Sequence, residues 1–207
     1  MPWRTASSTG SRRKPTGFIL PCQPTLAAVV PTGPQWIHEL KHDGYRIVAL
    51  KDGPSVRLWS RHGRDWTGEL AAVAAAVRAL PVERIVLDGE AVAHCGAGLP
   101  DFNGLMSQNG QAAACLYAFD LLRLEAEDLR PHPLGERRAR LADLVAAAAD
   151  PVLRFSEHLE AAEGPALFRH ACAMGLEGIV SKRADRPYRS GRSPHWLKIK
   201  NPSYWRA

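Results

Sequence analysis

Lys41 stands at the end of a predicted strand, directly before the tight turn His42-Asp43-Gly44. Lysine is a nucleophile only as the neutral amine, and burial or neighbouring cations favour that form because both lower its pKa. A solvated lysine on a surface turn accounts for the same residues equally simply. Lys41 is therefore a candidate nucleophile, and its assignment depends on what the chain places beside it.

Two further lysines are candidates for the neighbouring cations. Lys198 and Lys200 alternate with apolar residues in the segment 196–200, so both side chains fall on one face of a strand. Like charges on one face repel, and an anion held between them would explain their placement. Alternatively, the segment is a solvated edge strand whose lysines prevent pairing with the edge strand of another molecule. Arg61 stands in a similar alternation on another predicted strand.

Two glutamates lie in otherwise apolar segments. Glu90 ends the segment 87–90, and Glu177 begins the segment 177–180. A carboxylate there is costly unless it is paired, hydrogen-bonded, bound to a metal or on a solvated sheet face. Together with paired lysines, the glutamates describe a phosphoryl-transfer site assisted by a divalent cation. Phe119 is either a stacking surface for a base or plain core.

The elements that would position these residues are a mixture of strands and helices. Alternating apolar residues predict strands over 36–41, 45–50, 56–61, 85–93, 116–122, 178–183 and 196–200. Helical spacing predicts helices over 70–80, 134–145 and 161–174. Residues 18–34, broken by prolines, are expected to wrap the surface in extended form. Strand pairs joined by a hairpin, with helices between them, predict an α+β fold built on antiparallel sheets.

Charge is distributed unevenly along the 207 residues, whose formal net charge is +6. Residues 1–38 carry +4 and residues 182–207 carry +7, whereas residues 39–181 carry −5. Basic ends either grip nucleic acid phosphates or keep a tail solvated. Residues 1–17 are rich in Ser, Thr, Gly, Pro and Arg and are predicted to be a disordered basic tail, although a transit peptide has a similar composition.

The composition also excludes several classes of protein. No uncharged apolar run reaches the roughly 18 residues that a membrane span needs, and the N-terminus lacks the apolar core of a secretory signal. The four cysteines have no Cys-x-x-Cys spacing, and a chain of this size needs no disulfide framework. We therefore expect reduced thiols, a cytoplasmic location of the bacterial type and no membrane partner.

The candidate residues fall into an ordered series of motifs that resembles the series of ATP-dependent DNA ligases. These enzymes are covalent nucleotidyltransferases, as are RNA ligases and mRNA capping enzymes. The series is Lys41-His42-Asp43-Gly44-Tyr45-Arg46, Ser60-Arg61-His62-Gly63, Leu87-Asp88-Gly89-Glu90, Tyr117-Ala118-Phe119-Asp120, Glu177-Gly178-Ile179-Val180-Ser181-Lys182 and Trp196-Leu197-Lys198-Ile199-Lys200. Two further stretches, Arg64-Asp65-Trp66-Thr67 and Pro187-Tyr188-Arg189-Ser190-Gly191, resemble the ligase part of bacterial end-joining ligases.

The resemblance covers residues 18–202 and implies one adenylation (nucleotidyltransferase) domain over that range. Its fold would be antiparallel sheets flanked by helices, with the ATP pocket between the sheets. Such a domain transfers AMP from ATP to a lysine, then to a 5′-phosphate of nicked or broken duplex DNA, where a 3′-hydroxyl displaces AMP and seals the strand during repair or recombination.

The resemblance also implies roles for the basic residues. Lys41 would attack the α-phosphorus of ATP, expel pyrophosphate and hold AMP covalently. Lys198 and Lys200 match the lysines that hold the α-phosphate, where they would neutralise growing charge. Arg46 and Arg61 match arginines that bind the ATP phosphates and then the 5′-phosphate of the nick.

The remaining roles belong to carboxylates and one aromatic ring. Glu177 matches the acid that supports a divalent metal, Mg²⁺ or Mn²⁺. Glu90 matches the acid that contacts the ribose hydroxyls, and it is a second candidate for the metal. Phe119 matches the aromatic residue that stacks on adenine, and Glu39 is a candidate for reading the adenine amino group.

One departure from the family pattern concerns the C-terminus. These ligases continue into an OB-fold domain that orients the pyrophosphate and helps clamp the duplex, whereas residues 203–207 are too few for such a barrel. We therefore expect slow self-adenylation and weak unaided binding of DNA. The chain would be a stand-alone domain whose partner protein supplies the missing surface, a fragment, or a degenerate relative that still binds nucleotide.

Three functions compete at this point. An ATP-dependent DNA ligase module is favoured because the end-joining-like stretches indicate DNA and ATP. An RNA ligase or a capping-type nucleotidyltransferase shares the motif skeleton. A non-catalytic accessory that binds nucleotide or DNA without turnover is the third possibility.

Overall fold

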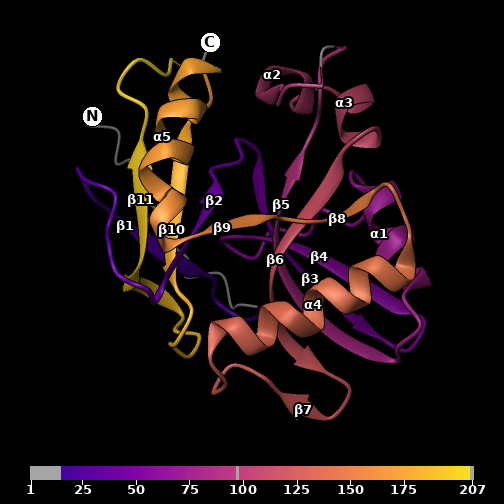
Figure 1. Cartoon of the computed structure of the whole chain (residues 1–207). Coiled ribbons are helices and arrows are strands. Elements are labelled where there is room, and N and C mark those ends of the chain that lie inside the picture. The colour runs from indigo at the N-terminus through magenta and orange to yellow at the C-terminus, as the bar shows by residue number, and fades with distance from the viewer. Residues whose placement is uncertain (1–14, 97, 206–207) are drawn as a thin grey trace, which may run out of the picture.

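Two β-sheets face each other in the computed structural model, which describes residues 15–96 and 98–205 (Figure 1). Most of the predicted tail, residues 1–17, lies outside the described residues. Within them, no helix combines the length and the apolar character needed to span a bilayer.

Sheet A brings together strands from the two ends of the chain. It contains β1 (Cys22–Leu26), β2 (Trp36–Leu40), β9 (His158–Glu160), β10 (Gly178–Arg183) and β11 (Gly191–Lys200). Their order across the sheet is β1-β11-β10-β2-β9. All neighbours are antiparallel except β1 and β11, which run parallel.

Sheet B is built mainly from the middle of the chain. It contains β3 (Tyr45–Asp52), β4 (Ser55–Ser60), β5 (Arg84–Val92), β6 (Cys115–Leu124), β7 (Glu127–Asp128) and β8 (Leu153–Phe155). The path runs β4-β3-β5-β6-β7, and β8 pairs with β6 in parallel. The predicted hairpin joins β3 to β4, and Gly53 supplies its positive φ of 55°.

Helices cover the outer faces of both sheets. The helices α1 (Ala71–Ala79) and α4 (Leu134–Ala148) pack on sheet B, and α5 (Gly164–Ala173), preceded by the 3₁₀ turn Ala161–Glu163, packs on sheet A (Figure 1). Two short helices, α2 (Phe102–Leu105) and α3 (Gln108–Ala112), lie between β5 and β6 in the chain. The amphipathic spacing that predicted the long helices places their apolar stripes against the sheets.

The inner faces of the sheets meet in a small apolar cluster that contains several polar neighbours. Val48, Val86, Phe119 and Leu122 of sheet B pack toward residues of sheet A such as Trp196. Carboxylates and cations are buried close to this cluster as well. They are Glu39, Asp88, Asp120, Arg137, Arg138 and Lys182. Buried charge is costly unless it is paired, so this interface is the place to look for a functional site.

The α+β fold with mainly antiparallel sheets is confirmed, and each predicted strand and helix is present within a few residues. The segment 18–34 contains the strand β1, which the prolines had hidden. Its parallel partner, β11, lies more than 160 residues further along the chain. The alternation of neighbouring residues cannot reveal such a pairing, because the pairing depends on the position of a distant segment in the folded chain.

Candidate active site

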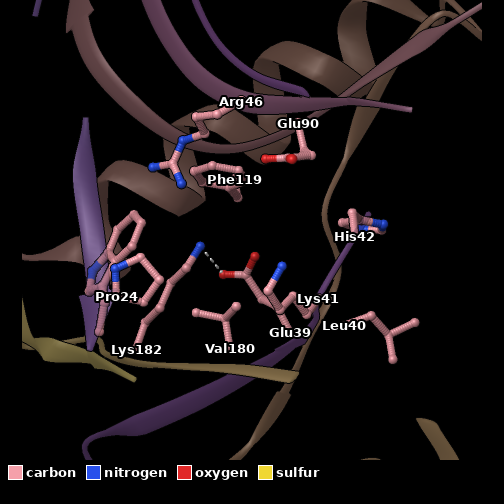
Figure 2. A pocket seen from close by; sticks show the side chains of 11 residues that line it. Pro24, Glu39, Leu40, Lys41, His42, Arg46, Glu90, Phe119, Val180 and Lys182 are labelled. Carbon is pink, nitrogen blue, oxygen red and sulfur yellow. Dashed lines mark ion pairs between the residues drawn. The ribbon is translucent and has the colours of Figure 1, made fainter. Parts of the chain in front are cut away.

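A pocket opens between the sheets beside the end of β2 (Figure 2). About 450 Å³ of empty space lies there, part of it open solvent, so the pocket is a partly open cleft between the sheets. Its lining residues are Pro24, Glu39, Leu40, Lys41, His42, Arg46, Glu90, Phe119, Val180, Lys182 and Trp196. Five of the predicted site residues therefore meet in one pocket: Glu39, Lys41, Arg46, Glu90 and Phe119.

Lys41 is held at the pocket by the neighbouring strand. Its backbone N–H donates to the carbonyl of Gly178 at 2.9 Å. Its Nζ donates to Glu177 Oε2 at 2.6 Å, and Lys200 Nζ lies 3.2 Å from the other oxygen, Oε1. Glu177 thus joins the candidate nucleophile to one of the predicted phosphate-binding lysines. Its own side chain is almost fully buried.

Glu39 points into the pocket toward Lys182, and both side chains are almost fully buried (Figure 2). Lys182 Nζ and Arg138 Nη1 donate to Glu39 Oε1 at 2.7 and 2.9 Å. Ser156 Oγ donates to Glu39 Oε2 at 2.9 Å. This carboxylate is paired with two cations in a dry environment.

The same contacts set the ionisation of the pair. Burial by itself would raise the pKa of Glu39, but Arg138 and Lys182 outweigh it and hold this pKa below its usual range. Burial lowers the pKa of Lys182 to about 8, although Glu39 opposes that change. The ammonium also lies 4.1 Å from the centre of the Phe119 ring and 4.3 Å from that of Trp196, where the ring faces attract it.

Arg46 is fixed by a buried carboxylate. Its Nε and Nη2 donate to the two oxygens of Asp88 at 2.6 and 2.8 Å, and Tyr188 Oη donates to the same carboxylate at 2.6 Å. Burial would lower the pKa of Arg46, but Asp88 outweighs it and raises that pKa. The guanidinium carbon lies 4.4 Å from the centre of the Phe119 ring. A base that stacks on Phe119 would therefore meet Arg46 and Lys182 as well.

Glu90 and His42 also line the pocket, and Glu90 is directly opposite Arg46 on the adjacent strand. Burial raises the pKa of Glu90 to about 7, and Arg46 and Lys41 only partly oppose this. Burial also lowers the pKa of His42 to about 4, so its ring is neutral at physiological pH. That ring stacks on Tyr117 with 4.2 Å between the centroids. The pocket therefore carries a carboxyl group that titrates near neutral pH, as is common in functional sites.

The other predicted basic residues surround this pocket without lining it. Lys198 and Lys200 lie on β11, and Lys198 is opposite Val180 of β10. Partial burial lowers the pKa of Lys198, and the ammonium groups of Lys200 and Lys41 lower it further. Arg61 directly follows β4 and is exposed, and its positive charge also lowers the pKa of Lys198.

The carboxylates offer a limited set of metal ligands. Among residues 15–96 and 98–205, no three His, Cys, Asp or Glu side chains form a group able to hold a metal ion. Glu177 and Glu90 are close enough that each charge acts on the other. Mg²⁺ is commonly bound by one or two carboxylates together with substrate phosphates and water. The residues fit such an ion only when a nucleotide completes its coordination.

Sequence reasoning missed several residues that complete the site. Lys182 and Asp88 were part of quoted motifs but had no assigned role, and Arg138 and Ser156 were not selected. Arg138 and Ser156 come from α4 and from the link between β8 and β9. One usable signal was the position of Arg138, four residues after Leu134 and three before Leu141. Helical spacing puts it on the apolar face of the predicted helix, where a buried charge needs a partner.

Comparisons with known proteins agree with this geometry. A family model described as "ATP dependent DNA ligase domain" matches residues 22–200. The multifunctional non-homologous end joining protein LigD of Pseudomonas aeruginosa is 41% identical over 206 residues, which cover 95% of this chain but 24% of that protein. The chain therefore spans about a quarter of the length of this curated relative.

Two solved structures share the fold. The ligase domain of M. tuberculosis LigD is 34% identical with a TM-score of 0.75, and the match covers 87% of this chain and 60% of that one. A mycobacterial DNA ligase D complexed with ATP and MES is also 34% identical, with a TM-score of 0.72 over 87% of this chain and 59% of that one. Because the family model spans most of the chain and the fold and pocket agree with it, the chain belongs to the ATP-dependent DNA ligase domain family.

Proposed function

We propose that this chain performs nucleotidyl transfer for DNA ligation, with AMP joined first to Lys41 and then passed to a 5′-phosphate of DNA. One observation carries the proposal. Four residues predicted from three motifs, together with Glu39 just before the first motif, line one pocket between the sheets. They lie on β2, β3, β5 and β6 and in the turn after β2. ATP in the related mycobacterial structure supports ATP as the nucleotide.

Glu39 and Lys182 would read the base. A carboxylate oxygen and an ammonium group lie 2.7 Å apart, so they present an acceptor and a donor side by side. Adenine offers the matching pair, with the amino group N6 as donor and N1 as acceptor. Guanine offers the reverse, with O6 as acceptor and N1 as donor, and would leave buried polar groups unpaired. Phe119 and Val180 would enclose the ring from sheet B and sheet A.

Lys41 would attack the α-phosphorus from the end of β2. A nitrogen–phosphorus bond forms as the bond to pyrophosphate breaks, pyrophosphate leaves, and the attacking amine releases one proton to water. Lys198, Lys200 and the more distant Arg61 would hold the phosphate oxygens as negative charge grows there. The binding of phosphates by Arg46 stays a prediction. Because Asp88 fixes this guanidinium 4.4 Å from the centre of the Phe119 ring, we propose that it also helps to orient the nucleotide.

Glu177 and Glu90 would hold a divalent cation together with the phosphates, and Mg²⁺ or Mn²⁺ suits that donor set. Bound there, the cation would neutralise phosphate charge. Glu177 now accepts from Lys41 and forms an ion pair with Lys200, so a cation at this carboxylate would compete with both ammonium groups. Glu90 would also accept from the ribose hydroxyls.

We propose nicked or broken duplex DNA as the acceptor of AMP, in a cytoplasmic setting. The relatives that carry this domain are multifunctional end-joining proteins much longer than this chain, so further protein surfaces would complete its grip on DNA. The basic C-terminal stretch 182–207, with a charge of +7, provides attraction for the phosphate backbone.

A labelling experiment tests the proposal. The protein is incubated with Mg²⁺ and either α-labelled ATP or α-labelled GTP, and the products are separated on a denaturing gel. An acid-labile adduct from ATP, absent in Lys41→Ala and in Lys41→Arg, is the expected result. Lys41→Arg is the matched control for charge, since it keeps a cation opposite Glu177 but offers no amine nucleophile.

The other functions give different results. An adduct from GTP in preference to ATP would indicate a capping-type enzyme. Failure to form any adduct would leave a nucleotide- or DNA-binding accessory. A nicked duplex with a preformed 5′-adenylate then tests sealing independently of self-adenylation, and the same nick in RNA tests an RNA ligase.

A further inference from the structure

Arg138 is an arginine of α4 that is buried behind the nucleotide pocket and does not line it. Its Nη1 donates to Glu39 Oε1 and to the carbonyl of Phe119, each at 2.9 Å. Its Nη2 donates to the carbonyl of Ser156 at 2.6 Å and to His158 Nδ1 at 3.1 Å. One guanidinium thus connects a strand of sheet A, a strand of sheet B and the link between β8 and β9.

The donor count shows how Arg138 acts. Arginine has five N–H donors, and four of them are used by the contacts above. The fifth, on Nε, is buried and has no acceptor among the described residues. Because four donors are occupied and the fifth is buried in a residue that does not line the pocket, Arg138 offers no donor to a nucleotide. Any effect on the reaction must pass through the groups that it holds.

Glu39 is the group that matters most among them. An ionised carboxylate has about four acceptor positions. Arg138, Lys182 and Ser156 Oγ fill three of them, which leaves about one for an exocyclic amino group in the pocket. Lys182 lines the pocket and would itself contact the base, whereas Arg138 and Ser156 are almost fully buried and do not line it. Arg138 and Ser156 are therefore the anchors that hold Glu39 from behind the pocket.

We propose that Arg138 and Ser156 are positioning residues that hold the Glu39 carboxylate in the direction required to select an amino-bearing base. The inference rests on the proposed nucleotide site. A planar guanidinium fixes direction as well as charge, whereas a lysine would supply charge alone. Selectivity for adenine would then depend on two residues that never touch the nucleotide.

Equilibrium binding of ATP and of purine riboside 5′-triphosphate, which lacks the amino group, tests the inference. Calorimetry without divalent cation prevents turnover, and the ratio of the two dissociation constants cancels the shared ribose and phosphate contacts. In the wild type we expect ATP to bind about tenfold more tightly, the value of one hydrogen bond to a charged acceptor. We expect Arg138→Lys to bring the ratio close to one, and Ser156→Ala to lower it by a smaller factor.

Arg137→Lys is the matched control. Arg137 lies on the same helix, is equally buried and donates to both oxygens of Asp120 at 2.7 Å, but it makes no contact with Glu39. We expect it to lower the melting temperature while it leaves the ratio unchanged. If Arg138→Lys does not fold, Ser156→Ala decides the question, since it removes one hydroxyl and leaves the backbone carbonyl in place.

An unchanged ratio in the folded variants would overturn the inference, and so would an equal fall in Arg137→Lys. A wild type that binds ATP selectively but forms no Lys41 adduct would refute the proposed catalysis and leave this inference standing. A wild type that binds neither nucleotide would refute both.

Discussion

Glu90→Gln should stabilise the fold above neutral pH and have little effect in acid. The pKa of Glu90 is raised from 4.5 to about 7 by burial, with a further rise from Asp88 and Glu177, while Arg46 and Lys41 oppose it. Between these two pH values the folded protein holds a proton that the unfolded chain has released. The wild type therefore loses stability as pH rises from about 4.5 to about 7.

The size of the effect follows from the change in pKa. At 1.36 kcal/mol per pH unit, a rise from 4.5 to about 7 corresponds to about 3 kcal/mol. Glu90 remains partly exposed, so solvent screening reduces this to about 2 kcal/mol. Glutamine has nearly the same shape and no charge, and so avoids the penalty at every pH.

Urea unfolding of both proteins from about pH 5 to about pH 8.5 measures the effect as a difference in the free energy of unfolding. The difference should be near zero at the acid end, grow through pH 7 and then level off. His42, whose pKa is lowered to about 4, gives both proteins a stability that increases between about pH 4 and pH 6.5, and this contribution cancels in the difference. Lys182, whose pKa is about 8, changes the slope only above that pH.

A difference that does not change with pH, or one that is largest in acid, would refute the assignment of the raised pKa to Glu90. The same substitution should slow formation of the Lys41 adduct, because it removes a proposed ligand of the ribose and the metal. Stability would then rise while activity falls, as is common where a functional carboxyl is held in an unfavourable environment.

Three further substitutions probe how the fold holds the site. Gly178→Ala should lower the melting temperature by several degrees in a thermal scan, or prevent folding. The backbone of Gly178 has a φ of 133°, and a Cβ there would overlap the carbonyl oxygen of Ile199. Lys51→Met should lower the free energy of unfolding in urea by about 2 kcal/mol. The reason is that Lys51 Nζ donates to the carbonyls of Arg78 and Leu80 at the end of α1, both at 2.7 Å. An unchanged urea midpoint would contradict this prediction. Asp88→Asn should cost about 3 kcal/mol or more and weaken ATP binding, because it removes a fully buried carboxylate that neutralises the partly buried Arg46. Asp128→Asn, in an exposed pair, should cost less than about 1 kcal/mol. Equal losses in the two asparagine variants would refute the role given to burial.

The sequence by itself determined the elements and the family. Period-two alternation and helical spacing depend on neighbouring residues, so strands such as 85–93 and helices such as 134–145 could be predicted with small errors at their ends. The ordered motifs also identified the residue types that would carry phosphoryl chemistry. Four of these residues, with Glu39 just before the first motif, line one pocket. The parallel strand β1 was missed, because its partner lies at the far end of the chain.

Only the tertiary structure decided which charges meet. In the sequence, Glu39 is one residue of an alternating strand and nothing marks its partners. In the structure it is buried between Lys182 on the adjacent strand and Arg138, which is 99 residues away in the chain. Lys41 and Glu177 are 136 residues apart and share a hydrogen bond of 2.6 Å. The strength of such contacts depends on burial and on distances of a few ångströms, and both arise only when the two sheets close on each other.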